Sequence, residues 1–177
     1  PPPTQLFNDV VYDKGAWILH MLRMRIGDDI FFELLWAWLN DSGRPYHNAT
    51  TSDFTSLASG MAGEDLSLFF DSYLTETTVP HIQWGYKLSD DSKSMNFSML
   101  DVSGVDFDNI YPIKVMTADG TFHDESIHLI GPSGEAEFNF DSEIISVELD
   151  PNHSVLWAPA EYVLSTSRIT NAYPNPS

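Results

Sequence analysis

The chain has 177 residues, 42% of them hydrophobic and 13% aromatic, which is enough to bury a core and argues against disorder. Its formal net charge of −18 argues against nucleic acid or an anionic membrane as a partner, because both are bound through Lys and Arg. No apolar run approaches the roughly 20 residues that cross a bilayer. The absence of Cys excludes a disulfide framework but not secretion.

The first part of the chain, up to about residue 78, has the hydrophobic period of helices. A first helix is predicted from about Asp9 to Ile26, and Gly27 ends it because glycine adopts the left-handed conformation at low cost. The second helix, from Ile30 to Leu39, is apolar on nearly all sides, so we expect it to be buried at the centre of a helical layer. The aromatic residues expected in this core are Trp17, Phe31, Phe32, Trp36 and Trp38.

Two more helices are predicted before the pattern changes. Thr50 with Asp53 three residues later resembles a capping box, and it starts a short third helix that ends near Gly60. The fourth helix begins around residues 63–66 and ends before Val79-Pro80.

From His81 onward hydrophobic residues alternate with polar ones, as in half-buried strands. Asp119-Gly120 predicts a hairpin turn, because Gly takes the positive φ that a tight turn requires. Asp150-Pro151-Asn152 is expected to form the turn between the last two strands. The runs that we expect as strands are 82–88, 95–100, 113–116, 126–130, 136–140, 144–149 and 155–157.

The predicted fold class is therefore α+β in two segments, a helical layer followed by an antiparallel β-sandwich. The expected division is residues 1–79, residues 80–165 and a polar, Pro-rich linker at 166–177. Within that linker, Tyr173-Pro174-Asn175-Pro176 resembles the start of the C-terminal sorting domains of the type IX secretion system. This resemblance implies a secreted or cell-surface protein, with the sorting domain truncated here.

The histidines do not form the pair that a helical zinc site requires. Two imidazoles bind one ion from one helix face when they are four residues apart, and no two histidines here have that spacing. His123 and His128 are five apart in a strand-like run, so they are expected on the surface. We expect no complete zinc site within this chain.

Four features occur in order over some seventy residues. They are the run Tyr12-Asp13-Lys14-Gly15, the joint 26–32, the helix start 48–54, and the run 65–71 before Val79-Pro80. Together they resemble the zinc aminopeptidases of the M1 (gluzincin) family, whose β module commonly follows the catalytic domain.

The resemblance implies a role for Tyr12. In the family, the matching tyrosine donates a hydrogen bond to the oxyanion that forms when zinc-bound water attacks the peptide carbonyl. The family's His-Glu-x-x-His motif and third-ligand Glu lie upstream of this tyrosine, and this chain contains no such motif. Without the resemblance, Tyr12 would be interpreted as a packed phenol.

The resemblance implies that the chain is the C-terminal part of a zinc aminopeptidase that removes N-terminal residues from peptides. The fragment would be inactive alone and would hold no cofactor. The alternative is a noncatalytic binding or interaction module on a peptidase-derived scaffold. The apolar second helix also predicts that the isolated chain self-associates.

Overall fold

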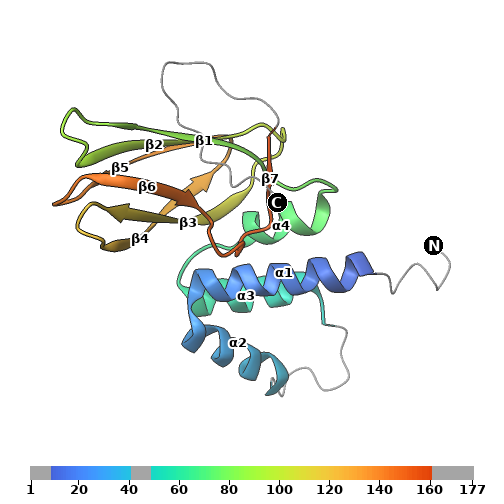
Figure 1. The fold of residues 1–177 in the computed structure, drawn as a ribbon. Helices are drawn as coiled ribbons and strands as arrows, with labels where there is room; N and C mark the ends of the chain where they lie inside the picture. Colours follow the sequence, from blue (N-terminus) through green and yellow to red (C-terminus); the bar gives the residue numbers. More distant parts are fainter. Residues whose placement is uncertain (1–8, 41–48, 161–177) are drawn as a thin grey trace. The chain divides into compact units, whose positions relative to one another are not determined.

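A computed structural model describes residues 9–40 and 49–160 of the chain. The chain separates into two compact units, Pro1–Thr75 and Glu76–Ser177. The first is helical and the second is built of strands (Figure 1). The sequence therefore predicted the α+β class and the order of the two segments. The sorting-domain-like run at residues 173–176 lies outside the described residues.

The helical unit contains four helices, and the first two meet at a sharp joint. Gly27 has φ of 80°, and its N–H donates to the carbonyl of Arg23 at 2.9 Å, so glycine ends the first helix as predicted. Across the joint, the Arg23 guanidinium donates two hydrogen bonds of 2.8 Å to the Asp28 carboxylate. The helices are α1 (Asp9–Ile26), α2 (Asp28–Asn40), α3 (Thr51–Ala62) and α4 (Ser67–Thr75).

The start of α3 confirms the predicted capping box. The backbone N–H of Asp53 donates to the Thr50 hydroxyl at 3.2 Å, and the Asp53 carboxylate accepts from the Thr50 backbone N–H at 2.9 Å. Each residue thus satisfies a backbone donor of the other, which fixes where the helix begins.

The core of the helical unit draws on all four helices and on the loop before α4. Arg25 is bound within it. Its side chain is 4% exposed, forms a 2.7 Å ion pair with Glu64, and lies over the Phe69 ring at 5.8 Å. The ion pair thus ties α1 to the segment between α3 and α4. The buried apolar residues are Ile18, Met21, Leu22, Ile26, Phe31, Leu34, Ala58, Leu66, Phe69, Phe70 and Tyr73.

The prediction that α2 is buried on most sides was wrong. Phe31 and Leu34 are buried, and Trp38 packs edge-on against Phe54 of α3 with ring centroids 5.1 Å apart. Phe32 and Trp36, both expected in the core, are 54% and 70% exposed. An apolar helix has no polar face to mark its solvent side, so its sequence cannot tell which faces are covered.

The second unit is the predicted β-sandwich, made of two sheets (Figure 1). One sheet has the strand order β5-β2-β1-β7 and the other has the order β4-β3-β6. Adjacent strands are antiparallel except for a two-residue parallel pairing of β1 with β7. The strands are β1 (His81–Leu88), β2 (Ser94–Asp101), β3 (Asp108–Thr117), β4 (Phe122–Ile130), β5 (Ser133–Asn139), β6 (Ile144–Leu149) and β7 (Ala158–Pro159).

The β3–β4 hairpin forms where the sequence placed it. Gly120 has φ of 82°, and its N–H donates to the carbonyl of Thr117 at 2.9 Å. The Asp119 carboxylate accepts from the Thr117 hydroxyl at 2.7 Å and from the Thr121 backbone N–H at 3.0 Å. The side chain of Asp119 and the backbone freedom of Gly120 therefore fix this turn together.

The strand expected at 155–157 was wrong, because a carboxylate holds that segment in another conformation. Asp150 Oδ1 accepts from the backbone N–H of Ser154 at 2.7 Å and from its hydroxyl at 2.6 Å. Asp150 Oδ2 accepts from the Val155 backbone N–H and from Trp157 Nε1, both at 3.1 Å. The short strand β7 begins only after the residues that Asp150 binds.

None of the helices in the described ranges is long and apolar enough to span a membrane.

Candidate functional site

Tyr12 lies near the start of α1, on its open surface. Its side chain is 61% exposed, and its hydroxyl makes no hydrogen bond to another residue in the described part of the chain. A Cβ added at Gly15, three residues further along the helix, would meet no atom within 4 Å. Within the described residues, the Tyr12 phenol is therefore not packed in a core. The phenol can donate a hydrogen bond to a molecule outside this helix.

The same side of α1 continues with exposed, uncharged residues. Ala16 and Leu19 follow Tyr12 at helical spacings of four and seven, and both are exposed. Beside them, the Trp17 and His20 rings meet edge to face at 5.8 Å. This side of α1 resembles the wall of a site rather than a complete one, because it offers a hydrogen-bond donor and apolar surface only.

The described residues do not supply a metal centre. No group of three His, Asp, Glu or Cys side chains in residues 9–40 and 49–160 is placed to hold an ion. The zinc that the resemblance implies does not fit these residues.

His123 and His128 are on β4 but project to opposite faces, because successive strand residues alternate and the two are five apart. His123 Nε2 is 3.2 Å from the Thr117 hydroxyl, and its ring lies 4.7 Å from that of Phe140. His128 Nε2 is 2.5 Å from a carboxylate oxygen of the buried Asp108. Neither histidine lies near the other.

Sequence reasoning missed the pairing of His128 with Asp108. Asp108 precedes the predicted strand 113–116, whereas the observed β3 already begins at this residue. In the β3–β4 register, Ile110 lies opposite His128, and Asp108 lies two residues before Ile110, on the same face of the sheet. The pairing of the two strands could have been anticipated from the hairpin, but the length of β3 could not, because Pro112 argues against a strand.

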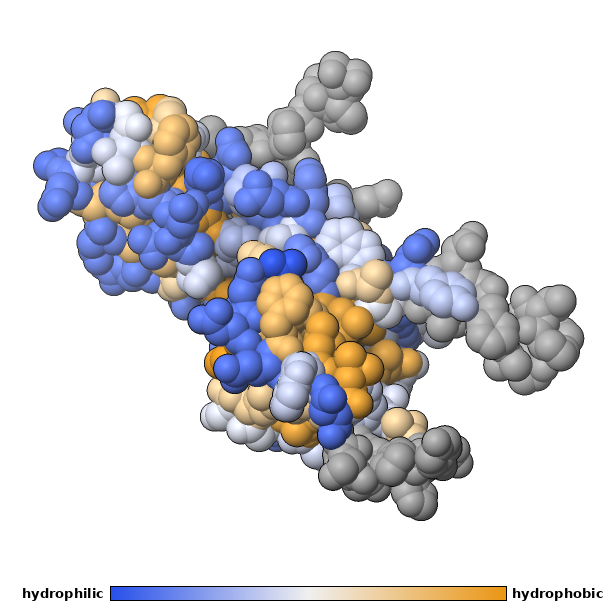
Figure 2. Space-filling model, turned by 90° about the horizontal axis from the view of Figure 1, so that it is seen from below, coloured by the Kyte–Doolittle hydropathy of each residue, from blue (hydrophilic) through white to orange (hydrophobic). Residues whose placement is uncertain are grey.

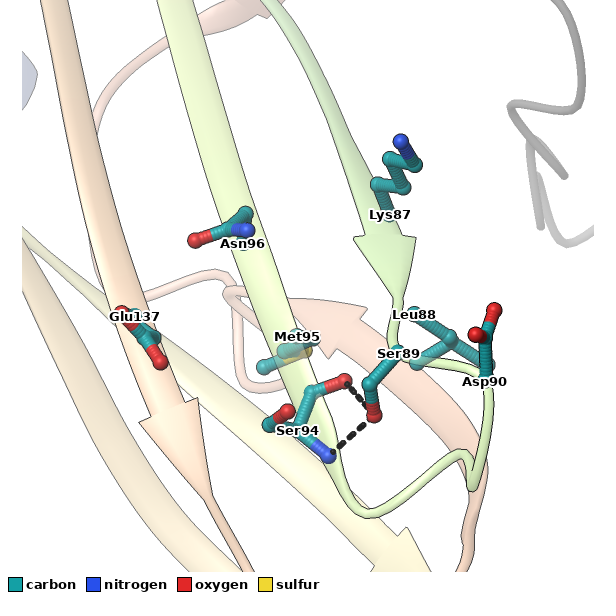
Figure 3. A pocket seen from close by; sticks show the side chains of 8 residues that line it. All are labelled: Lys87, Leu88, Ser89, Asp90, Ser94, Met95, Asn96 and Glu137. Carbon is teal, nitrogen blue, oxygen red and sulfur yellow. Dashed lines mark hydrogen bonds between the residues drawn. The ribbon is translucent and has the colours of Figure 1, made fainter.

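A polar depression lies at the β1–β2 turn (Figure 3). Three of its side chains, Lys87, Asn96 and Glu137, come from adjacent strands and are aligned across the sheet by the strand register. Figure 3 also shows the Ser89 hydroxyl between the backbone N–H and the carbonyl of Ser94, which closes the turn. Its charged side chains, Lys87, Asp90 and Glu137, are all exposed.

Comparison with known proteins shows which family the helical unit is similar to. Residues 2–73 match the peptidase family M1 domain. Aminopeptidase N of Lactococcus lactis subsp. lactis is 34% identical over 71 residues, which is 40% of this chain and 8% of that protein. The helical unit is therefore peptidase-related.

Two further comparisons extend over both units. Probable aminopeptidase 1 of Sulfurisphaera tokodaii is 26% identical over 175 residues, which is 96% of this chain and 21% of that protein. A crystal structure of Legionella pneumophila aminopeptidase A in complex with aspartic acid matches 91% of this chain and 19% of its own with a TM-score of 0.77 and 22% identity. The latter shows a shared fold. The chain spans about a fifth of the length of each of these two proteins.

Proposed function

We propose that this chain is the part of a zinc-dependent aminopeptidase that supplies the oxyanion-stabilising hydroxyl, from Tyr12. The observation that carries the proposal is the exposed phenol of Tyr12 within the segment that matches the M1 domain. The substrate class is a peptide with a free N-terminus, as the names of the relatives suggest. The parent would hydrolyse the N-terminal peptide bond, and this chain alone would be inactive.

The proposed contribution of Tyr12 is one hydrogen bond. The substrate carbonyl oxygen becomes negative only as the tetrahedral intermediate forms, and a phenol positioned beside it stabilises that charge. Such a donor lowers the barrier because it binds the transition state more tightly than the substrate. Zinc and its ligands would come from parts of the parent outside this chain. The described residues offer no alternative set.

The test is Tyr12→Phe in the intact parent enzyme. Removing one oxyanion donor costs about 3–4 kcal/mol, so kcat should fall roughly 100- to 1000-fold while KM changes little. The matched control is Tyr86→Phe, which removes the same atom from a half-exposed side chain on β1. A kcat near that of the wild type in Tyr12→Phe would disprove the role. A well-folded but inactive parent would favour the noncatalytic binding module instead.

We also propose that the parent is exported through a type IX secretion system. The proposal is based on residues 173–176 alone. The parent should appear at the cell surface or in the medium of its host, and disruption of that secretion system should retain it inside the cell. Unchanged export after such disruption would reject the proposal.

A further inference from the structure

An apolar stripe is left on the outer face of α2. It consists of Phe32, Trp36 and Leu39, which follow one another at spacings of four and three and are 54%, 70% and 82% exposed. The stripe is opposite the face that packs on α3 through Trp38. Figure 2 shows hydrophobic residues gathered on the surface of the helical unit. Contact of three large apolar side chains with water is unfavourable. A partner that covered them would therefore form a complex stabilised by their burial.

We propose that the stripe is a dimerisation surface that binds the same stripe of a second copy of this chain. The two α2 helices would pair antiparallel across a twofold axis near Trp36, so that Phe32 of each copy lies near Leu39 of the other. This inference concerns the 177-residue chain itself and does not depend on the proposed function.

The distribution of charge permits this contact despite the net charge of −18. The exposed Glu33 is the one charged residue of α2 between Phe32 and Asn40, and it lies three residues before Trp36, so no charged side chain lies at the axis itself. At the N-terminal end of the stripe, Arg23 lies over the Phe32 ring at 5.2 Å and is paired with Asp28. Of the 26 acidic side chains, 16 belong to residues 76–177, outside the helical unit. Repulsion between the exposed charges of two copies is screened by salt.

The available area fits a weak dimer. Large aromatic side chains bury roughly 150–250 Å² each when fully covered. With these exposures, the stripes of two copies and the half-exposed Leu35 beside them would bury roughly 1,000 Å² together, which is at the lower limit for a specific interface. Trp is the residue most often found at the energetic centre of such contacts. A dissociation constant in the micromolar range, on the order of 10 μM, is expected.

The test is sedimentation equilibrium of the chain between about 1 and 200 μM. The expected result is a monomer–dimer equilibrium that tightens several-fold from about 0.05 to 0.5 M NaCl, because salt screens the repulsion and does not weaken apolar contacts. Trp36→Glu should weaken dimerisation more than tenfold, because it places two carboxylates at the twofold axis. Phe122→Glu is the matched control: Phe122 is a 59% exposed aromatic on β4, and its variant should dimerise normally. Circular dichroism checks that both variants fold.

A second measurement uses the absence of cysteine from the chain. Leu35→Cys should form a disulfide-linked dimer on mild oxidation, and Phe122→Cys should not. A chain that stays monomeric at 200 μM in high salt would overturn the proposal. So would an association that Phe122→Glu abolishes and Trp36→Glu leaves intact, or equal cross-linking of the two cysteine variants.

Discussion

Two buried aspartates in the sandwich use their carboxylates differently, and the difference predicts opposite responses to the same substitution. Asp150 accepts four hydrogen bonds, two on each oxygen. Asp101 accepts two, from the backbone N–H groups of His81 and Ser103, both on Oδ1. Asp101 Oδ2 is buried and has no hydrogen-bond partner among the described residues. Both carboxylate oxygens of Asp150 therefore accept hydrogen bonds, whereas only one oxygen of Asp101 does.

Replacing each with asparagine tests this difference. In Asp150→Asn the new NH2 group faces the Ser154 backbone N–H in one orientation and the two N–H donors of Val155 and Trp157 in the other, so the free energy of unfolding should fall by about 3 kcal/mol. In Asp101→Asn the oxygen keeps both bonds and the NH2 group replaces the oxygen that has no partner, so the change should stay below about 1 kcal/mol. Urea denaturation of the sandwich measures both.

Asp101→Ala is the control for the second variant, because it removes the used oxygen as well. It should cost about 1–3 kcal/mol, since two backbone donors lose their acceptor. If Asp101→Asn destabilises the chain as much as Asp150→Asn does, then Asp101 Oδ2 accepts a hydrogen bond from a group outside the described residues.

At the level of elements, the sequence predicts those boundaries that local side-chain contacts set. The Thr50–Asp53 box and the Asp119-Gly120 turn were both predictable, because each depends on residues within four positions of one another. The exposure of Phe32 and Trp36 was not, because burial depends on which distant segments cover a helix. The false strand at 155–157 has a different cause, because the Asp150 side chain, five to seven residues earlier, outweighs strand propensity there.

The turn of the β3–β4 hairpin should stabilise the sandwich in a pH-dependent way. The hydrogen bond from the Thr117 hydroxyl, assisted by the Thr121 N–H, lowers the pKa of Asp119 below its ordinary value of 3.8. A lowered pKa in the folded state means that the ionised form stabilises the fold above the unfolded pKa. This contribution is lost as the pH falls through the folded pKa.

Asp119→Asn tests this contribution, because asparagine keeps an acceptor oxygen but carries no charge. The wild type should melt at a slightly higher temperature than the variant at pH 7, and the difference should shrink toward zero as the pH falls through the folded pKa of Asp119. Melting followed by circular dichroism at a series of pH values measures it. A difference that stays constant over this range would show that charge on Asp119 contributes nothing to the turn.

At the level of the whole molecule, the sequence predicted the division into a helical and a strand segment but not the order of strands in the sheets. Pairing β2 between β1 and β5 depends on contacts between distant residues, such as Phe97 with Ala136, that no local pattern encodes. The candidate site shows the same limit. Tyr12 was found by its resemblance to a family, and its exposure came only from the structure. No group that could hold a metal ion occurs among the described residues, so the structure does not complete the proposed site.

Because each unit holds its own core, the two should unfold as separate cooperative units. Leu22 and Tyr73 in the helical unit, and Phe97 and Tyr111 in the sandwich, are fully buried. A domain with a complete core of its own can fold on its own. A substitution inside one unit should therefore leave the stability of the other unchanged.

Two variants test this independence, one in each unit. Glu64→Ala removes the carboxylate paired with the buried Arg25 and should destabilise the helical unit by about 3 kcal/mol. Asp150→Asn should destabilise the sandwich alone. Hydrogen exchange with mass spectrometry under mildly denaturing conditions separates peptides from residues 9–75 and 76–160. Each variant should accelerate exchange in its own unit only, because the other core is untouched. If either variant accelerated exchange equally in both, the chain would be one cooperative unit, and burial in one core would stabilise the other.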